Sequence, residues 1–151
     1  MAYTTAEGRT RILDDMASAV SLLAAAVTAL GEAYEHLDEQ AAERMEERLF
    51  RPLQGAYGQL GRGQREFAAR SGLALPATSA PAVRMPESAR ASLEHAAGAI
   101  EEADTILAEL QDSLLPVEVG DQRLREALSG TRSVIAPLPE VCDDVIRTLG
   151  R

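Results

Sequence analysis

The two histidines are the side chains of this sequence whose type and setting come closest to metal chemistry. His36 and His95 each directly follow a glutamate. Di-metal helical bundles bind their ions with inward-pointing glutamates and with Glu-x-x-His pairs, in which the carboxylate precedes the imidazole by three positions. Here Ala33 and Ser92 occupy those positions. The motif is therefore absent twice, and the sequence predicts no internal metal or cofactor site, although binding of a metal at the surface by either histidine stays open.

The positions of the histidines argue against a shared site as well. His95 falls in line with Glu102 and Glu109 on a stripe that points away from the apolar row of its helix, as expected for a solvated acidic face. In an up-down bundle, His36 lies near the end of the first helix and His95 near the start of the third. At about 1.5 Å rise per residue these positions are ~30 Å or more apart. We therefore expect the two histidines at opposite ends of the molecule.

Other catalytic patterns are missing too. The sequence contains no Gly-x-Ser-x-Gly turn for a hydrolytic nucleophile. Its glycine-rich stretch, residues 55–63, lacks the lysine and the preceding strand of a phosphate-binding loop, and the whole chain contains no lysine. Cys142 is the single cysteine and falls on an apolar row, which favours a small buried side chain over a reactive thiol. We predict no catalytic and no cofactor-binding residue, and hence a protein that is not an enzyme.

Arginine and glycine recur at steps of three and four residues in one part of the chain, which places them on one face of a helix. The residues of this face are Arg48, Arg51, Gly55, Gly58, Arg62 and Arg65. Residues 51–70 carry four Arg and one Glu, a charge of +3, whereas the rest of the chain carries −12 of the total of −9. Each helical glycine costs about 1 kcal/mol relative to alanine.

Two interpretations of this face stay open. A smooth, positively charged helix face suits an acidic helix, supplied by a protein partner or by a second copy of the chain. Alternatively, Arg51 and Arg62 form ordinary pairs with Glu47 and Glu66 at i,i+4 spacing on a wet surface, and the glycines only allow close packing within the bundle.

Composition narrows the class of protein. With 151 residues the chain fits one domain, here residues 1–151, and its 3% aromatic content with many strong helix formers favours an all-α fold. A net charge of −9 disfavours nucleic acid and anionic lipid as partners. The uncharged residues 16–31 fall short of the roughly 20 residues that cross a bilayer, and acidic rather than basic residues precede them. We expect a cytoplasmic protein without a membrane partner.

Apolar residues at alternating steps of four and three predict four helices, over about residues 5–37, 39–70, 87–115 and 121–149, with a long connection at 71–86. The simplest arrangement is a single up-down-up-down four-helix bundle. The predicted inward rows are Ile12, Met16, Ala19, Leu23, Ala26, Leu30, Ala33 and Leu37; Met45, Leu49, Leu53, Ala56, Leu60, Gly63 and Phe67; Ala89, Leu93, Ala96, Ile100, Ala103, Leu107, Leu110 and Leu114; and Leu124, Leu128, Thr131, Ile135, Leu138, Cys142, Val145 and Leu149.

Alanine at alternate positions of the first and third rows predicts that these two helices pack most closely. The rows keep their phase across Pro52 and Pro137, so we expect the second and fourth helices to be kinked rather than broken. Thr4 and Glu7 have the spacing of a capping box, and Asp38 and Asp121 are suitable N-caps for later helices. Asp38 favours a turn near Leu37–Asp38. The alternative is one helix that continues to Phe50.

On these grounds we expect a non-enzymatic helical interaction or scaffold protein that associates with itself or with another protein. The alternative is a ferritin-like bundle that binds metal or carries out redox chemistry. That alternative requires glutamate and histidine on the inward rows, where the sequence has none. A small-molecule ligand stays open, because kinks at proline can open a cavity.

Overall fold

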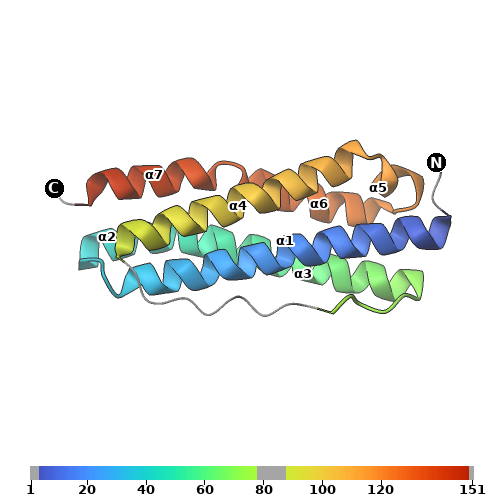
Figure 1. Cartoon of the computed structure of the whole chain (residues 1–151), viewed down its shortest axis with the longest axis horizontal. Helices are drawn as coiled ribbons and strands as arrows, with labels where there is room; N and C mark the ends of the chain where they lie inside the picture. Colours follow the sequence, from blue (N-terminus) through green and yellow to red (C-terminus); the bar gives the residue numbers. More distant parts are fainter. Residues whose placement is uncertain (1–3, 78–87, 150–151) are drawn as a thin grey trace.

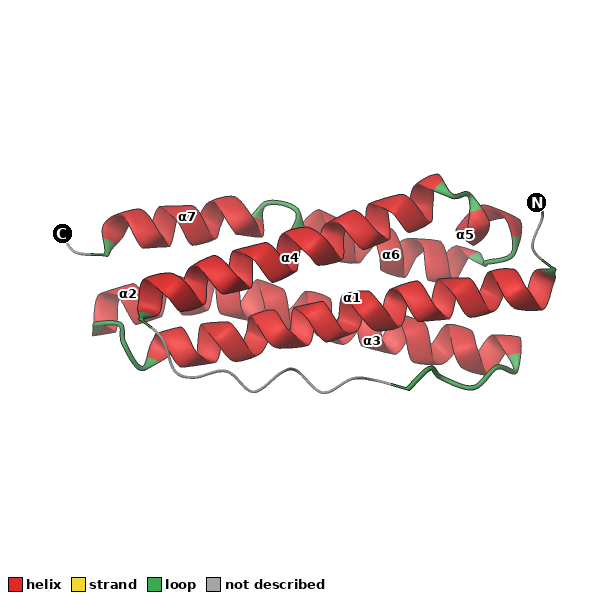
Figure 2. Cartoon of the chain, in the orientation of Figure 1, coloured by secondary structure: helices red, strands yellow, loops and turns green. Residues whose placement is uncertain are grey.

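The computed structural model describes residues 4–77 and 88–149, and within them the secondary structure is entirely helical, without a strand (Figure 2). Five of the described helices are longer than ten residues, in place of the four that we predicted. The elements are α1 (Thr5–Tyr34), α2 (Glu39–Met45), a π-helical segment η1 (Glu46–Phe50), α3 (Arg51–Ser71), α4 (Ala89–Asp112), α5 (Leu115–Glu118), α6 (Gln122–Ile135) and α7 (Leu138–Thr148).

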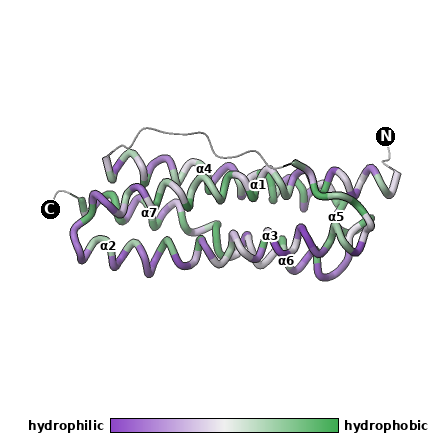
Figure 3. The backbone as a smooth tube through the Cα atoms, turned by 90° about the horizontal axis from the view of Figure 1, so that it is seen from below, coloured by the Kyte–Doolittle hydropathy of each residue, from purple (hydrophilic) through white to green (hydrophobic). Residues whose placement is uncertain are grey.

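The long helices lie side by side along one axis (Figure 1). α1 and α6 each pack against both α3 and α4. In Figure 1, α4 and α6 lie above α1 and α3, and in the perpendicular view of Figure 3, α1 and α4 lie above α3 and α6. α3 and α4 therefore occupy opposite corners of the molecule.

The order of helix directions differs from the predicted up-down-up-down arrangement. α3 ends and α4 begins at opposite ends of the molecule, so these two helices run in the same direction, and α1 runs opposite to both (Figure 1). Residues 72–88 separate them, and an extended chain covers up to about 3.3 Å per residue, enough to reach from one end to the other. Residues 78–87 of the predicted connection lie outside the described residues.

The predicted N-caps of the first two helices are confirmed. The Thr4 hydroxyl accepts a hydrogen bond from the backbone N–H of Glu7 at 3.1 Å, and the Glu7 carboxylate accepts one from the backbone of Thr4. The Asp38 carboxylate caps α2 by accepting from the backbone N–H of Ala41 at 2.8 Å. The turn near residue 38 is therefore present, α1 ends at Tyr34 rather than at residue 37, and a single helix to residue 50 is wrong.

The ends of the later helices also depart slightly from the prediction. α4 begins at Ala89 behind the N-cap Ser88, and it ends at residue 112 rather than 115. Leu114 then adopts a left-handed backbone with φ of 67° and turns the chain into α5. Asp121 caps α6, as predicted, by accepting from the backbone N–H of Leu124 at 2.9 Å.

Pro52 does not interrupt the second predicted helix. The π-helical segment η1 precedes it, and the backbone stays helical from Met45 through Arg51. A π turn has one more residue than an α turn, and it accommodates the missing proline N–H within a continuous helix. The hydroxyl of Tyr34 donates a hydrogen bond to Glu46 of this segment and so ties it to the end of α1.

The predicted kink at Pro137 is instead a break. α6 ends at Ile135, two residues form a turn, and α7 begins at Leu138 (Figure 2). Pro137 and Pro139 both lack a backbone N–H, and their rings clash with carbonyls one turn earlier. Two such residues in one turn remove too many backbone hydrogen bonds for the helix to continue.

The core follows the predicted rows almost completely. Their members are buried except Leu37, Leu149 and Gly63, which are partly buried, and Leu114, which is 56% exposed because of its left-handed turn. α1 and α4 form the most extensive contact between any two elements, which confirms the predicted close pair. Among the described residues, the buried polar side chains are Gln64, Ser92 and Thr131, so no carboxylate and no imidazole is buried there.

The uncharged residues 16–31 predict a segment too short to cross a membrane, but α1, which contains them, is long and apolar enough to do so. The most apolar 18-residue window of this helix has a mean hydropathy of 1.6, and 44% of it is buried inside the molecule. A helix at the core of a bundle passes the same test, so the finding is one long apolar helix near the N-terminus.

Candidate interaction surface

The predicted Arg–Gly face lies on the outer side of η1 and α3, away from the core. Of its six members, five are exposed and Gly58 is partly buried. Arg48 pairs with Asp144 of α7 at 3.2 Å, and Arg51 lies 3.8 Å from Glu46. In the part of the chain that the structure describes, Arg62 and Arg65 form no ion pair. The free positive charge of this face is therefore concentrated at its C-terminal half.

The i,i+4 ion pairs expected if this face is an ordinary solvated surface are not formed. Arg51 is paired with Glu46 rather than Glu47, and Arg62 is not paired with Glu66. Exposed pairs of this kind contribute only about 0–1 kcal/mol, so their absence has little effect on stability. It leaves Arg62 and Arg65 without an ion-pair partner among the described residues.

The two glycines of the face, Gly55 and Gly58, and the neighbouring buried Gly61 have different surroundings. A guanidinium nitrogen of Arg62 lies 3.1 Å from the position that a Cβ would take at Gly58, and one of Arg65 lies 3.2 Å from the same position at Gly61. These two arginine side chains therefore lie back over the helix surface. Gly55 has no atom within 4 Å of its Cβ position. Of the two glycines of the face, Gly55 therefore leaves the helix surface open, and Gly58 is covered by Arg62.

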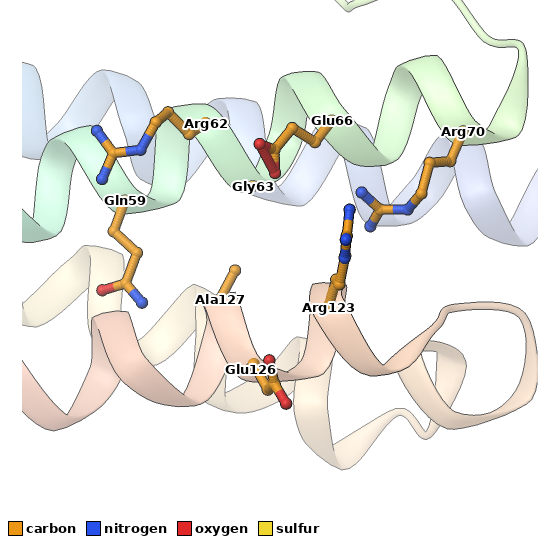
Figure 4. Close-up of a pocket in the computed structure, with 8 residues that line it drawn as sticks. All are labelled: Gln59, Arg62, Gly63, Glu66, Arg70, Arg123, Glu126 and Ala127. Carbon is orange, nitrogen blue, oxygen red and sulfur yellow. The ribbon is translucent and has the colours of Figure 1, made fainter.

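A groove of about 420 Å³ lies beside this face, between α3 and α6 (Figure 4). The residues that line it are Gln59, Arg62, Gly63, Glu66, Arg70, Arg123, Glu126 and Ala127. At its floor the helices approach closely, because a Cβ on Gly63 would stand 2.7 Å from the Cβ of Ala127. Two small residues thus bring the backbones of α3 and α6 together.

The charges within the groove are largely balanced. Arg70 donates two hydrogen bonds to Asp121, at 2.7 and 2.9 Å. These bonds, together with the backbone N–H of Leu124, hold the pKa of Asp121 below its usual range, against the opposing effect of burial. Arg123 extends from α6 toward Arg70, and Glu66 points into the groove (Figure 4). The groove therefore offers less uncompensated charge than the outer face of α3.

The prediction that the two histidines lie at opposite ends of the molecule is wrong. α4 runs opposite to α1, so the end of α1 and the start of α4 are at the same end of the molecule (Figure 1). His36 and His95 are both exposed there. Within residues 4–77 and 88–149, however, no group of three or more His, Cys, Asp or Glu side chains is placed to hold a metal ion.

Cys142 is fully buried on α7 and belongs to the apolar core, as its position in the row predicted. Burial raises the pKa of its thiol to about 12, and the negative charges of Asp143 and Glu101 act in the same direction. Since the thiolate is the nucleophilic form, the native side chain is chemically inert at neutral pH.

We expect Cys142 in the native protein to resist a thiol reagent such as Ellman's reagent at about pH 8, close to the ~8.5 pKa of a free thiol. Reaction should follow the rate of unfolding and become immediate in denaturant. The raised pKa also favours the folded state below the unfolded-state pKa, and this contribution is lost as the pH rises toward about 12. Rapid labelling of the native protein would contradict the burial of this thiol.

Comparison of the chain with protein-family models, with curated proteins and with solved structures finds no match. The assignment of a function therefore rests on the geometry of this chain. The feature that the geometry singles out is the exposed Arg–Gly face of η1 and α3, since the buried side chains of the described residues are almost all apolar.

Proposed function

We propose that this chain is a cytoplasmic four-helix-bundle scaffold, not an enzyme, that associates with itself through the Arg–Gly face of η1 and α3. The observation that carries the proposal is the pair of exposed arginines, Arg62 and Arg65, which form no ion pair with the described residues of a protein whose net charge is −9. In an acidic protein, such a local positive face is attracted to the acidic surface of another copy.

The interior supports this proposal because its few polar groups offer no acid–base or ligand chemistry. The side chain of Gln64 donates a hydrogen bond to the backbone carbonyl of Leu13 at 3.2 Å. The other buried polar groups are the hydroxyls of Ser92 and Thr131. A ferritin-like metal or redox bundle needs inward carboxylates, and none of the described carboxylates is buried. A stoichiometric metal ion in the purified protein, lost in the His36→Ala variant, would contradict this proposal.

We expect Gly58→Leu to abolish self-association without loss of helix content. The leucine side chain would displace the Arg62 guanidinium, whose nitrogen lies 3.1 Å from the Cβ position, and would project from the face that binds the second copy. Because the neighbour is the flexible end of a side chain, the helix itself should accommodate the change. Sedimentation velocity gives the mass, and circular dichroism gives the helix content.

Gly31→Leu is the matched control. Gly31 is also an exposed helical glycine, with no atom within 4 Å of its Cβ position, but it lies on α1, outside the Arg–Gly face. This variant should associate as the unaltered chain does. If Gly58→Leu leaves association unchanged, or if Gly31→Leu abolishes it equally, the Arg–Gly face is not the interface.

A further inference from the structure

The outer face of α4 has the opposite charge to the outer face of α3. Residues 89–112 contain one Arg and six acidic residues. Glu94 is paired with Arg90 at 3.1 Å, whereas Glu101, Glu102 and Glu109 are exposed and form no ion pair within the described residues. This surface is therefore negative along most of its length.

The small residues of α4 add to this complementarity. Gly98 is exposed between acidic residues, and no atom lies within 4 Å of its Cβ position. On α3, Gly55 is equally open. Glycine lets helix backbones approach closely, and an open glycine on each surface therefore suits the packing of one helix against the other.

The two faces match in length. Arg51 and Arg65 are 14 positions apart on α3, which corresponds to roughly 21 Å at the helical rise, and Glu94 and Glu109 are 15 positions apart on α4, or roughly 22 Å. Two helices packed along this length can therefore bring the unpaired Arg62 and Arg65 near the unpaired glutamates of α4.

Within one molecule these faces cannot meet. α3 and α4 occupy opposite corners, since α1 and α6 each pack between them, and their outer faces point away from each other (Figures 1 and 3). Contact between α3 faces of two copies would place arginine opposite arginine, and like charges in contact are repulsive. The outer face of α4 on a second copy, by contrast, offers the α3 face a row of acidic side chains along a helix.

We propose that the basic face of α3 in one copy binds the acidic face of α4 in the next, in a head-to-tail arrangement. This inference rests on the self-association proposed above and specifies the partner surface. Because the two complementary faces lie on opposite sides of each molecule, the assembly keeps one free basic face at one end and one free acidic face at the other. Head-to-tail contacts that do not close into a ring give open chains of molecules.

Two charge-reversal variants test this arrangement. The first, Arg62→Glu with Arg65→Glu, removes the basic face, and the second, Glu102→Arg with Glu109→Arg, removes the acidic face. These side chains are exposed and unpaired within the described residues, so both variants should keep the helix content and melting temperature of the unaltered chain. Each variant alone should sediment as a monomer of about 16.1 kDa.

The mixture of the two variants is the decisive sample. One variant then has two acidic faces and the other has two basic faces, so they should bind each other in alternation and form assemblies that contain both in a 1:1 ratio and are heavier than the 16.1 kDa monomer. A chain that carries all four substitutions should again self-associate, because its two reversed faces are complementary.

Several outcomes would overturn the head-to-tail arrangement. If the variant with Glu102→Arg and Glu109→Arg still assembles like the unaltered chain, α4 is not the partner surface, although self-association through α3 survives. A mixture that stays monomeric overturns the arrangement as well. If the unaltered chain is monomeric under all conditions, the proposed self-association itself is wrong.

Discussion

Replacement of Ile100 by alanine should lower the free energy of unfolding by about 2–5 kcal/mol. Ile100 is completely buried on α4, the helix that makes the most extensive contact with α1. Its neighbours in the buried row, Ala96 and Ala103, are already small, so few side-chain atoms nearby can move to fill the cavity. Equilibrium unfolding in guanidinium chloride measures the change.

Thr105→Ala provides the control on the same helix. Thr105 is exposed, and the substitution should change stability by no more than about 0.5 kcal/mol. If Ile100→Ala and Thr105→Ala have similar small effects, the contact between α1 and α4 does not form the rigid core of the molecule.

Gly63→Leu should destabilise the protein by about 1–3 kcal/mol through overpacking between α3 and α6. The first added atom alone would stand 2.7 Å from the Cβ of Ala127, which is attached to the helix backbone and cannot rotate away. The two helices must therefore separate or shift. Equilibrium unfolding in guanidinium chloride again measures the change in the free energy of unfolding. This salt also screens any association between charged faces.

Gly55→Leu tests whether the effect depends on the position or on the loss of a glycine. Gly55 is on the same helix, is exposed and has open space around its Cβ position, so leucine should stabilise the helix by up to about 1 kcal/mol. Opposite signs for the two variants are the expected result. Equal destabilisation would mean that α3 and α6 do not approach closely at Gly63.

The sequence predicted which residues face the core, because that information is local. Steps of four and three residues between apolar side chains place them on one side of a helix wherever that helix lies in the molecule. N-caps are equally local: Thr4, Asp38 and Asp121 each bond to a backbone N–H three residues further on. These predictions needed no knowledge of how the helices are arranged.

The direction of α4 could not be read from the same pattern. A buried row looks identical in a helix that runs up or down, and the long connection before α4 permits either arrangement. This one uncertainty also reversed the expected placement of His36 and His95. The break at Pro137 was missed for a related reason, since a row that keeps its phase is compatible with a kink and with a short turn.

The residues of the Arg–Gly face were found from their spacing, but the contacts around them were not. The groove depends on Arg70 and Asp121, which are 51 residues apart and meet only because α3 packs against α6. The acidic face of α4 was visible in the sequence as a stripe, yet its position diagonally opposite α3 is a property of the three-dimensional arrangement.

The mass of the unaltered chain in solution, measured by sedimentation equilibrium over a range of protein and salt concentrations, tests the central claim most directly. At low ionic strength the average mass should exceed 16.1 kDa and rise with protein concentration. At about 1 M salt, where the screening length falls to roughly 3 Å, the mass should return toward that of the monomer. A mass of 16.1 kDa at every protein and salt concentration would contradict self-association through charged faces.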